Sequence, residues 1–142
     1  MTHDVIVDTG PLVAFLNRRD AWHLWALQQF ELIAPPIVTC EAVLSEATFL
    51  LSRDNAGVDG ILQMVERGIL RVDFSAQAEM THLRRLMKRY ANVPMSFADA
   101  CLVRMSEGRA RGTVMTLDED FRVYRRLGRQ VIPLIAPPKQ PR

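Results

Sequence analysis

The chain has 142 residues, 49% of them apolar and 24% charged, and its formal net charge is +2. This length allows one domain with a substantial core and excludes two. A charge interrupts every apolar run before it reaches the roughly 18 residues of a membrane span, and the N-terminus lacks a signal-peptide pattern, so we expect a soluble cytoplasmic protein with no membrane contact.

The first half of the chain alternates short apolar runs with helical patterns. Residues 5–7 predict a strand, and residues 11–16 predict a helix because Pro11 is favoured in a first helical turn. Apolar residues spaced by three and four predict a helix over 22–32, a short strand follows at 37–38, and residues 41–52 and 57–67 predict two further helices.

The second half continues the alternation. Residues 69–74 predict a strand, and residues 76–90 predict an amphipathic helix with an apolar stripe on one side and Arg84, Arg85, Lys88 and Arg89 on the other. A helix over 96–107, a strand over 113–115, a helix over 119–126 and a strand over 130–135 follow, and residues 137–142 are expected to form a flexible tail.

This alternation contains no hairpin signal such as Asn-Gly, no internal repeat and no low-complexity segment. Strands that alternate with helices favour a parallel sheet, here of about four or five strands, covered by helices. We therefore expect an α/β fold in which residues 1–136 form the single domain.

Asp8 follows the most apolar strand, at residues 5–7. In an open parallel sheet, ligands bind beyond the carboxyl ends of the strands, which makes this acid a candidate for a binding site. Thr116, Asp118 and Asp120 follow the strand at 113–115 in the same way. Each could instead serve only as a helix N-cap.

Two further acids lie among apolar residues of helices. Glu46 has apolar neighbours at three- and four-residue spacing, including Phe49 and Leu50, which predicts an acid within an apolar stripe. Asp99 has a similar setting in FADACLV. The alternatives are an Arg-paired Glu46 and a capping box between Ser96 and Asp99.

One shared cause explains acids in four segments better than four coincidences. Mg²⁺ and Mn²⁺ prefer carboxylate oxygens, and a cation relieves the repulsion between converging acids. The charge distribution agrees, since residues 1–80 carry 5 Lys/Arg against 11 Asp/Glu and residues 81–142 carry 13 against 5. An acidic locus beside a basic surface suits a polyanionic ligand, although ordinary solvated helix faces would also produce the basic half.

These motifs resemble those of the PIN-domain ribonucleases, in particular the VapC-like toxins of toxin-antitoxin pairs. The resemblance extends from about residue 4 to residue 134 and rests on VIVDTGPLVAFL, VLSEATFLL, FADACLV and VMTLDEDF, in the family's order. It implies a three-layer α/β/α Rossmann-like sandwich and metal-dependent hydrolysis of RNA. It also implies a homodimer and an antitoxin partner.

By this resemblance, the acids that hold one or two Mg²⁺ or Mn²⁺ ions and serve catalysis are Asp8, Glu46, Asp99 and Asp118, with Asp120 as a further metal ligand. The hydroxyls expected to orient these groups or a water are those of Thr9, Ser96 and Thr116. The side chains expected to hold the RNA backbone are Arg84, Arg85, Lys88 and Arg89, joined by Arg104, Arg109 and Arg111.

The other polar and aromatic candidates have simpler interpretations. Cys40 and Cys101 have no CxxC partner and are expected to be small buried thiols. Residues expected at the surface or in packing, and not in the site, are Glu41, His3, His23, His82, Trp22 and Trp25. Two alternative functions stay open: a phosphohydrolase in which Asp8 attacks phosphorus, and a non-catalytic α/β binding module.

Overall fold

A computed structural model gives the fold and describes residues 4–108 and 112–138. Its centre is a 5-stranded sheet in the order β3-β2-β1-β4-β7, in which every neighbouring pair is parallel. The strands are β1 (Val5–Val7), β2 (Ile37–Thr39), β3 (Leu70–Val72), β4 (Thr113–Met115) and β7 (Leu134–Ile135). The predicted α/β class with a parallel sheet is confirmed.

The central strand β1 explains why its sequence is continuously apolar. It pairs with β2 on one side and with β4 on the other, with Ile6 opposite Val38 and Val114. Helices cover both faces, so Ile6 and Val7 have no exposed surface. A strand covered on both faces has no polar side, and alternation of polar and apolar residues disappears.

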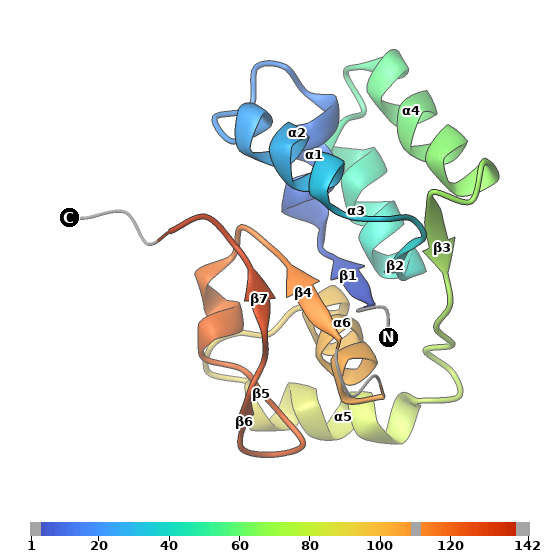
Figure 1. Cartoon of the computed structure of the whole chain (residues 1–142). Helices are drawn as coiled ribbons and strands as arrows, with labels where there is room; N and C mark the ends of the chain where they lie inside the picture. The colour runs from blue at the N-terminus through green and yellow to red at the C-terminus, as the bar shows by residue number, and fades with distance from the viewer. Residues whose placement is uncertain (1–3, 109–111, 139–142) are drawn as a thin grey trace.

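Six α-helices complete the layers (Figure 1). The helices α1 (Thr9–Leu16), α2 (His23–Leu32), α3 (Glu41–Leu50) and α4 (Asn55–Glu66) form a group in which α1 contacts the other three. The helix α6 (Phe97–Glu107) packs against β1 and β4, and α5 (Met80–Arg89) packs against α6. The predicted three-layer sandwich is confirmed.

The strand order places the expected binding edge. The chain moves from β1 to β2 and β3 in one direction, whereas β4 and β7 lie on the other side of β1. The topology therefore switches direction between β1 and β4, and ligands of such sheets bind beyond the carboxyl ends of the strands at the switch. Asp8 follows β1 and Thr116 follows β4 at this edge.

The C-terminal part differs from its prediction. The helix predicted over 119–126 is wrong: a short 3₁₀ helix, η1 (Glu119–Arg122), is followed by β5 (Arg125–Arg126). This strand pairs antiparallel with β6 (Gln130–Val131) through a turn in which Leu127 and Gly128 have φ values of 51° and 83°. The single strand predicted over 130–135 is therefore two strands, β6 and β7, and β5 and β6 form a hairpin that no Asn-Gly pair signals.

The predictions for the basic helix and for the two cysteines are confirmed. Leu83, Leu86 and Tyr90 of the α5 segment are buried while its four basic residues are exposed, as an amphipathic helix requires. Cys40 and Cys101 are buried free thiols.

In the ranges that the structure describes, no helix is long and apolar enough to cross a membrane. Most of the predicted tail, residues 139–142, lies outside those ranges.

Candidate active site

Asp8 occupies the switch point of the sheet and is only 7% exposed. Its backbone N–H donates to the Met115 carbonyl at 2.9 Å, which ties the end of β1 to β4. Its Oδ1 accepts the Thr9 N–H at 2.7 Å, so the N-cap interpretation holds for α1. Its Oδ2 accepts the Thr116 hydroxyl at 2.8 Å, a contact that capping does not require.

The loop after β4 brings two more acids to this edge. The Thr116 hydroxyl, fully buried, donates to Asp8 and accepts the Asp118 N–H at 2.9 Å. The Asp118 Oδ1 accepts the Asp120 N–H at 2.9 Å and caps η1. Asp118 is exposed and Asp120 half-buried. Thr116 thus links the two strand ends and orients the loop that carries both aspartates.

Asp99 lies in the first turn of α6 and is 8% exposed. The predicted capping box is present: Asp99 N–H donates to the Ser96 hydroxyl at 3.0 Å, and Ser96 N–H donates back to Asp99 Oδ2 at 3.5 Å. Tyr124 adds a stronger contact, because its hydroxyl donates to the same oxygen at 2.8 Å. No local sequence pattern predicts this contact, because Tyr124 lies 25 positions from Asp99 along the chain.

Glu46 differs from its prediction. Its side chain is exposed, and two of the four apolar neighbours that defined its stripe, Phe49 and Leu50, are 74% and 56% exposed, whereas Ala42 is half-buried and Val43 is buried. The buried side of α3 carries Val43 and Ala47, and Glu46 lies outside it. The interpretation of Glu46 as an acid in a buried apolar stripe is therefore wrong. Glu46 still lies at the rim of the site, where its Oε2 accepts the Thr9 hydroxyl at 3.3 Å.

The aspartates raise one another's pKa values. Burial raises the pKa of Asp8 to about 7, hydrogen bonds from Thr116 and Thr9 oppose this, and the charges of Asp99 and Asp118 add to it. Burial, followed by the Asp118 charge, also raises the pKa of Asp99 above its ordinary range, against the Tyr124 hydrogen bond. The pKa of Asp120 is raised by burial and by Asp118.

These acids have no cation among the side chains that the structure describes. None of the ion pairs formed there includes Asp8, Asp99, Asp118 or Asp120. Two buried carboxylates that repel each other and lack a basic partner favour protonation or a bound cation. The donor set is therefore chemically suited to Mg²⁺ or Mn²⁺, which prefer carboxylate oxygens.

The described acids do not by themselves form a closed metal cage. Within the described ranges, no three Asp, Glu, His or Cys side chains already stand close enough to enclose a metal ion. Mg²⁺ usually takes one or two carboxylates and retains several waters.

The predicted RNA-binding residues have different surroundings. Arg84, Arg85 and Lys88 are exposed on α5, and Arg89 lies over the Tyr90 ring with 5.2 Å between the guanidinium carbon and the ring centroid. Among the described residues, no hydrogen bond or ion pair joins these four side chains directly to the acids, although Tyr90 contacts the ring of Tyr124, which donates to Asp99. Two of the additional candidates, Arg109 and Arg111, lie outside the described residues.

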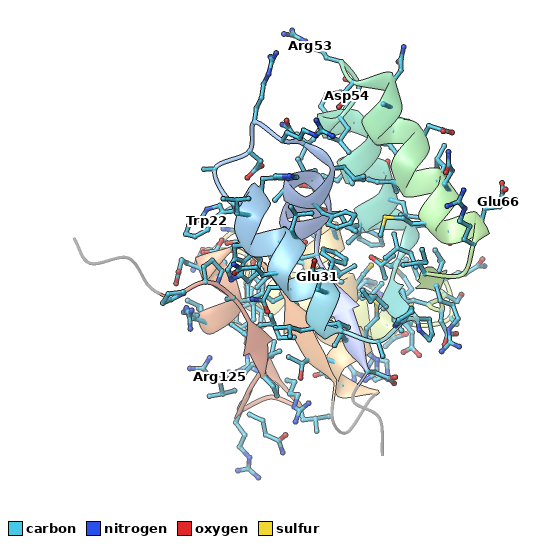
Figure 2. All side chains as sticks on the ribbon, turned by 45° about the horizontal axis from the view of Figure 1, so that its top comes forward. Trp22, Glu31, Arg53, Asp54, Glu66 and Arg125 are labelled. Atoms are coloured by element: carbon cyan, nitrogen blue, oxygen red, sulfur yellow. The ribbon has the colours of Figure 1, made fainter. Side chains whose placement is uncertain are left out.

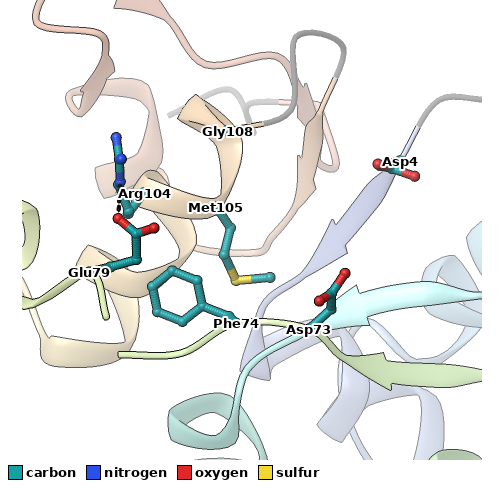
Figure 3. A pocket seen from close by; sticks show the side chains of 7 residues that line it. All are labelled: Asp4, Asp73, Phe74, Glu79, Arg104, Met105 and Gly108. Atoms are coloured by element: carbon teal, nitrogen blue, oxygen red, sulfur yellow. Dashed lines mark hydrogen bonds and ion pairs between the residues drawn. The ribbon is translucent and has the colours of Figure 1, made fainter. Parts of the chain in front are cut away.

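Arg104, another predicted RNA-binding residue, lines a pocket of about 420 Å³ away from the aspartates (Figure 3). Its guanidinium donates to Glu79 at 2.8 Å and to Glu107 at 3.3 Å. The pocket includes Asp4, which precedes β1, whereas Asp8 follows β1. This pocket and the aspartates are therefore at opposite ends of β1, and Arg104 already has two acidic partners.

The residues interpreted as lying outside the site have ordinary surroundings. His23 Nδ1 lies 2.7 Å from the Ala14 carbonyl, a packing contact, and Trp25 packs against the core. Glu41 is exposed in the first turn of α3. His82 and Trp22 are half-buried, and His3 lies outside the described residues.

Comparisons with known proteins agree with this architecture. The model of the PIN domain family matches residues 5–127. A crystal structure of VapC20 from Mycobacterium tuberculosis, described as a Sarcin-Ricin loop cleaving toxin, is similar with a TM-score of 0.74 and 23% sequence identity, over 84% of this chain and 94% of that one. No curated protein sequence matches.

Proposed function

The chain belongs to the PIN domain family, and we propose that it is a ribonuclease that hydrolyses RNA phosphodiester bonds with Mg²⁺ or Mn²⁺, as the toxin of a toxin-antitoxin pair. The family match and the fold of VapC20 support a nuclease. The observation that carries the proposal is the pair of buried carboxylates, Asp8 and Asp99, at the switch point of the sheet without a basic partner in the described ranges.

Asp8 and Asp99 would hold the ion directly, with Asp118, Asp120 and Glu46 around it. When bound, Mg²⁺ or Mn²⁺ supplies Lewis acidity, which lowers the pKa of water and neutralises charge on a phosphate. Thr116 keeps Asp8 oriented through its 2.8 Å hydrogen bond, and Tyr124 and Ser96 do the same for Asp99. No covalent nucleophile from the protein is needed for this hydrolysis.

The phosphohydrolase alternative has less support. Both Asp8 oxygens already accept hydrogen bonds, one from Thr9 and one from Thr116, which makes the carboxylate a weaker nucleophile. The binding-module alternative explains the caps that Asp8 and Asp99 form, but not why these acids are buried beside one another with raised pKa values. The metal-dependent nuclease explains both features.

Exposed apolar side chains support a protein partner. On α2, α3 and α4, five large side chains are more than half exposed: Leu24, Leu32, Phe49, Leu50 and Leu62. Apolar groups of this size favour burial against another protein surface. We propose that these helices contribute to a homodimer contact or to antitoxin binding.

The proposal is tested by RNA cleavage with the purified full chain. Structured RNA, including a sarcin-ricin loop oligonucleotide because VapC20 cleaves that loop, is incubated with Mn²⁺ or Mg²⁺ and with a chelator. We expect cleavage that the chelator stops and that Asp8→Asn and Asp99→Asn each lower by at least about a hundredfold. Asp59→Asn, an exposed acid of α4, is the matched control and should cleave like wild type.

Three results would contradict the proposal. Cleavage that survives the chelator and both substitutions would indicate a contaminating nuclease. A trapped phosphoenzyme at Asp8 would favour the phosphohydrolase. A wild-type protein that binds RNA or protein but cleaves no RNA with either metal would favour the binding module.

A further inference from the structure

The acid-rich half of the chain holds an unexpected group of arginines. Residues 1–80 contain only five basic residues, all arginines. Three of them, Arg18, Arg19 and Arg53, line one pocket of about 760 Å³. Arg18 and Arg19 follow α1, and Arg53 follows α3, so two separate connections bring them together.

The fold connects this pocket to the acids through two helices. Thr9 and Leu16, seven residues apart, share a side of α1, and Glu46 and Leu50, four apart, share a side of α3. Thr9 contacts Glu46 at one end, and Leu16 and Leu50 line the pocket at the other. At 1.5 Å per residue, the pocket begins about 10 Å along α1 from Thr9 and about 6 Å along α3 from Glu46.

The two connections that carry the arginines lie together in the fold. The connections from α1 to α2 and from α3 to α4 lie at the same end of the molecule (Figure 1). Arg53 and Asp54 extend from that end, far from Arg125 of the C-terminal hairpin (Figure 2). The pocket therefore lies where α1 and α3 end and is separate from α5 (Figure 1).

The arginines are available for a ligand. Arg18, Arg19 and Arg53 are exposed, and none of them is in an ion pair of the described residues, whereas Arg71 of the same half pairs with Asp73 at 3.5 Å. The one acid of the lining is Asp54, whose Oδ1 accepts the Gly57 N–H at 3.1 Å. The lining thus combines three guanidinium groups with one carboxylate that already caps α4.

We infer that this pocket is a subsite for the RNA backbone, in which Arg18, Arg19 and Arg53 hold a phosphate a few nucleotides from the bond that is cleaved. The inference rests on the proposed function. Guanidinium groups bind phosphate oxygens in a fork geometry and carry no base information, so the subsite fixes the strand without selecting its sequence. The acids and these arginines then contact phosphates that lie a few nucleotides apart on one strand.

The test measures RNA binding by the full chain in chelator, so that no cleavage occurs. A fluorescent single-stranded RNA is titrated at several salt concentrations with wild type, Arg18→Ala/Arg53→Ala and the control Arg67→Ala/Arg71→Ala, which removes two exposed arginines of the same half outside the pocket. We expect the pocket variant to bind about tenfold more weakly at low salt and to lose about 0.7 from the salt slope for each phosphate contact removed. The control variant should match wild type.

A second arm uses metal and RNA length. A dinucleotide too short to reach the pocket should be cleaved equally by wild type and the pocket variant, while a longer RNA should show a raised KM with the pocket variant only. Arg18→Lys/Arg53→Lys, which keeps the charges, should retain most of the affinity.

Equal RNA affinity of the pocket variant and wild type would overturn the inference and leave the proposed function intact. A selective loss of binding to polyglutamate, with RNA affinity unchanged, would also overturn it, in favour of an acidic protein partner. Loss of RNA affinity in the pocket variant, with no cleavage by wild type under any metal, would uphold the subsite and contradict the nuclease.

Discussion

Asp8→Asn should make the metal-free protein more stable at alkaline pH. Native Asp8 is almost fully buried, and its pKa is raised from the ordinary value of 3.8 to about 7. The native protein therefore binds a proton between these pH values that the unfolded chain has released. Stability is highest below the unfolded pKa and falls as pH rises through this interval, with the full cost present above about pH 7.

The difference between 3.8 and about 7 corresponds to about 4 kcal/mol at pH 8. At pH 4.5 only about 1 kcal/mol of this cost is present, because that pH lies less than about one unit above the unfolded pKa of 3.8 and far below the native value of about 7. Asparagine has nearly the shape of the protonated acid and carries no charge. Asp8→Asn should thus gain about 3 kcal/mol relative to wild type between these pH values, and relief of its repulsion with Asp99 acts in the same direction.

Urea unfolding with a chelator at both pH values measures this difference. Asp59→Asn is the control, because Asp59 is exposed on α4 and its substitution should change stability equally at both values. If Asp8→Asn were destabilised by the same amount at pH 4.5 and pH 8, the Asp8 carboxylate would carry no burial cost. The reasoning that a cation is needed there would then lose its basis.

Three other predictions concern the surroundings of the acids and the outer surface. Tyr124→Phe removes the hydroxyl that donates to Asp99 at 2.8 Å, and we expect a loss of about 2 kcal/mol in urea unfolding together with weaker Mn²⁺ binding. Phe49→Glu places a charge on the exposed apolar surface and should convert a dimer to a monomer in light scattering. Arg84→Glu/Arg85→Glu reverses two charges of the exposed α5 face and should weaken RNA binding most at low salt.

Each of these has a control or a contrary outcome. Tyr90→Phe removes a hydroxyl that accepts the Arg125 N–H, and a fall in Mn²⁺ affinity equal to that of Tyr124→Phe would show that the Asp99 contact is not what matters. A Phe49→Glu protein that keeps its mass would exclude α3 from the contact. RNA affinity unchanged in Arg84→Glu/Arg85→Glu would place the RNA elsewhere.

The central fold follows from local patterns. Three short, mostly apolar runs are too short for helices and form strands of the parallel sheet, which is covered on both faces: Val5–Val7, Ile37–Thr39 and Thr113–Met115. The region after Phe121 has no such pattern, because β5 and β6 have two residues each. Their hairpin depends on positive φ values at Leu127 and Gly128, and the sequence contains no Asn-Gly pair that would predict it.

The positions of three candidate acids could also be predicted from local sequence patterns. Strand ends and capping signals place Asp8, Asp99 and Asp118, because those depend on neighbouring residues. The exposure of Glu46 could not be predicted from the sequence. Helical spacing shows which residues share a side of α3 but not whether another element covers that side. Tyr124 reaches Asp99 only through the tertiary fold.

The central claim is that the clustered aspartates hold a divalent cation. Mn²⁺ binding, followed by electron paramagnetic resonance of the free ion, tests it directly with wild type, Asp8→Asn, Asp99→Asn and the control Asp59→Asn. We predict one or two ions bound by wild type and Asp59→Asn, and affinity at least about tenfold weaker in each site variant. Equal Mn²⁺ binding by all four proteins, or none by wild type, would contradict the account.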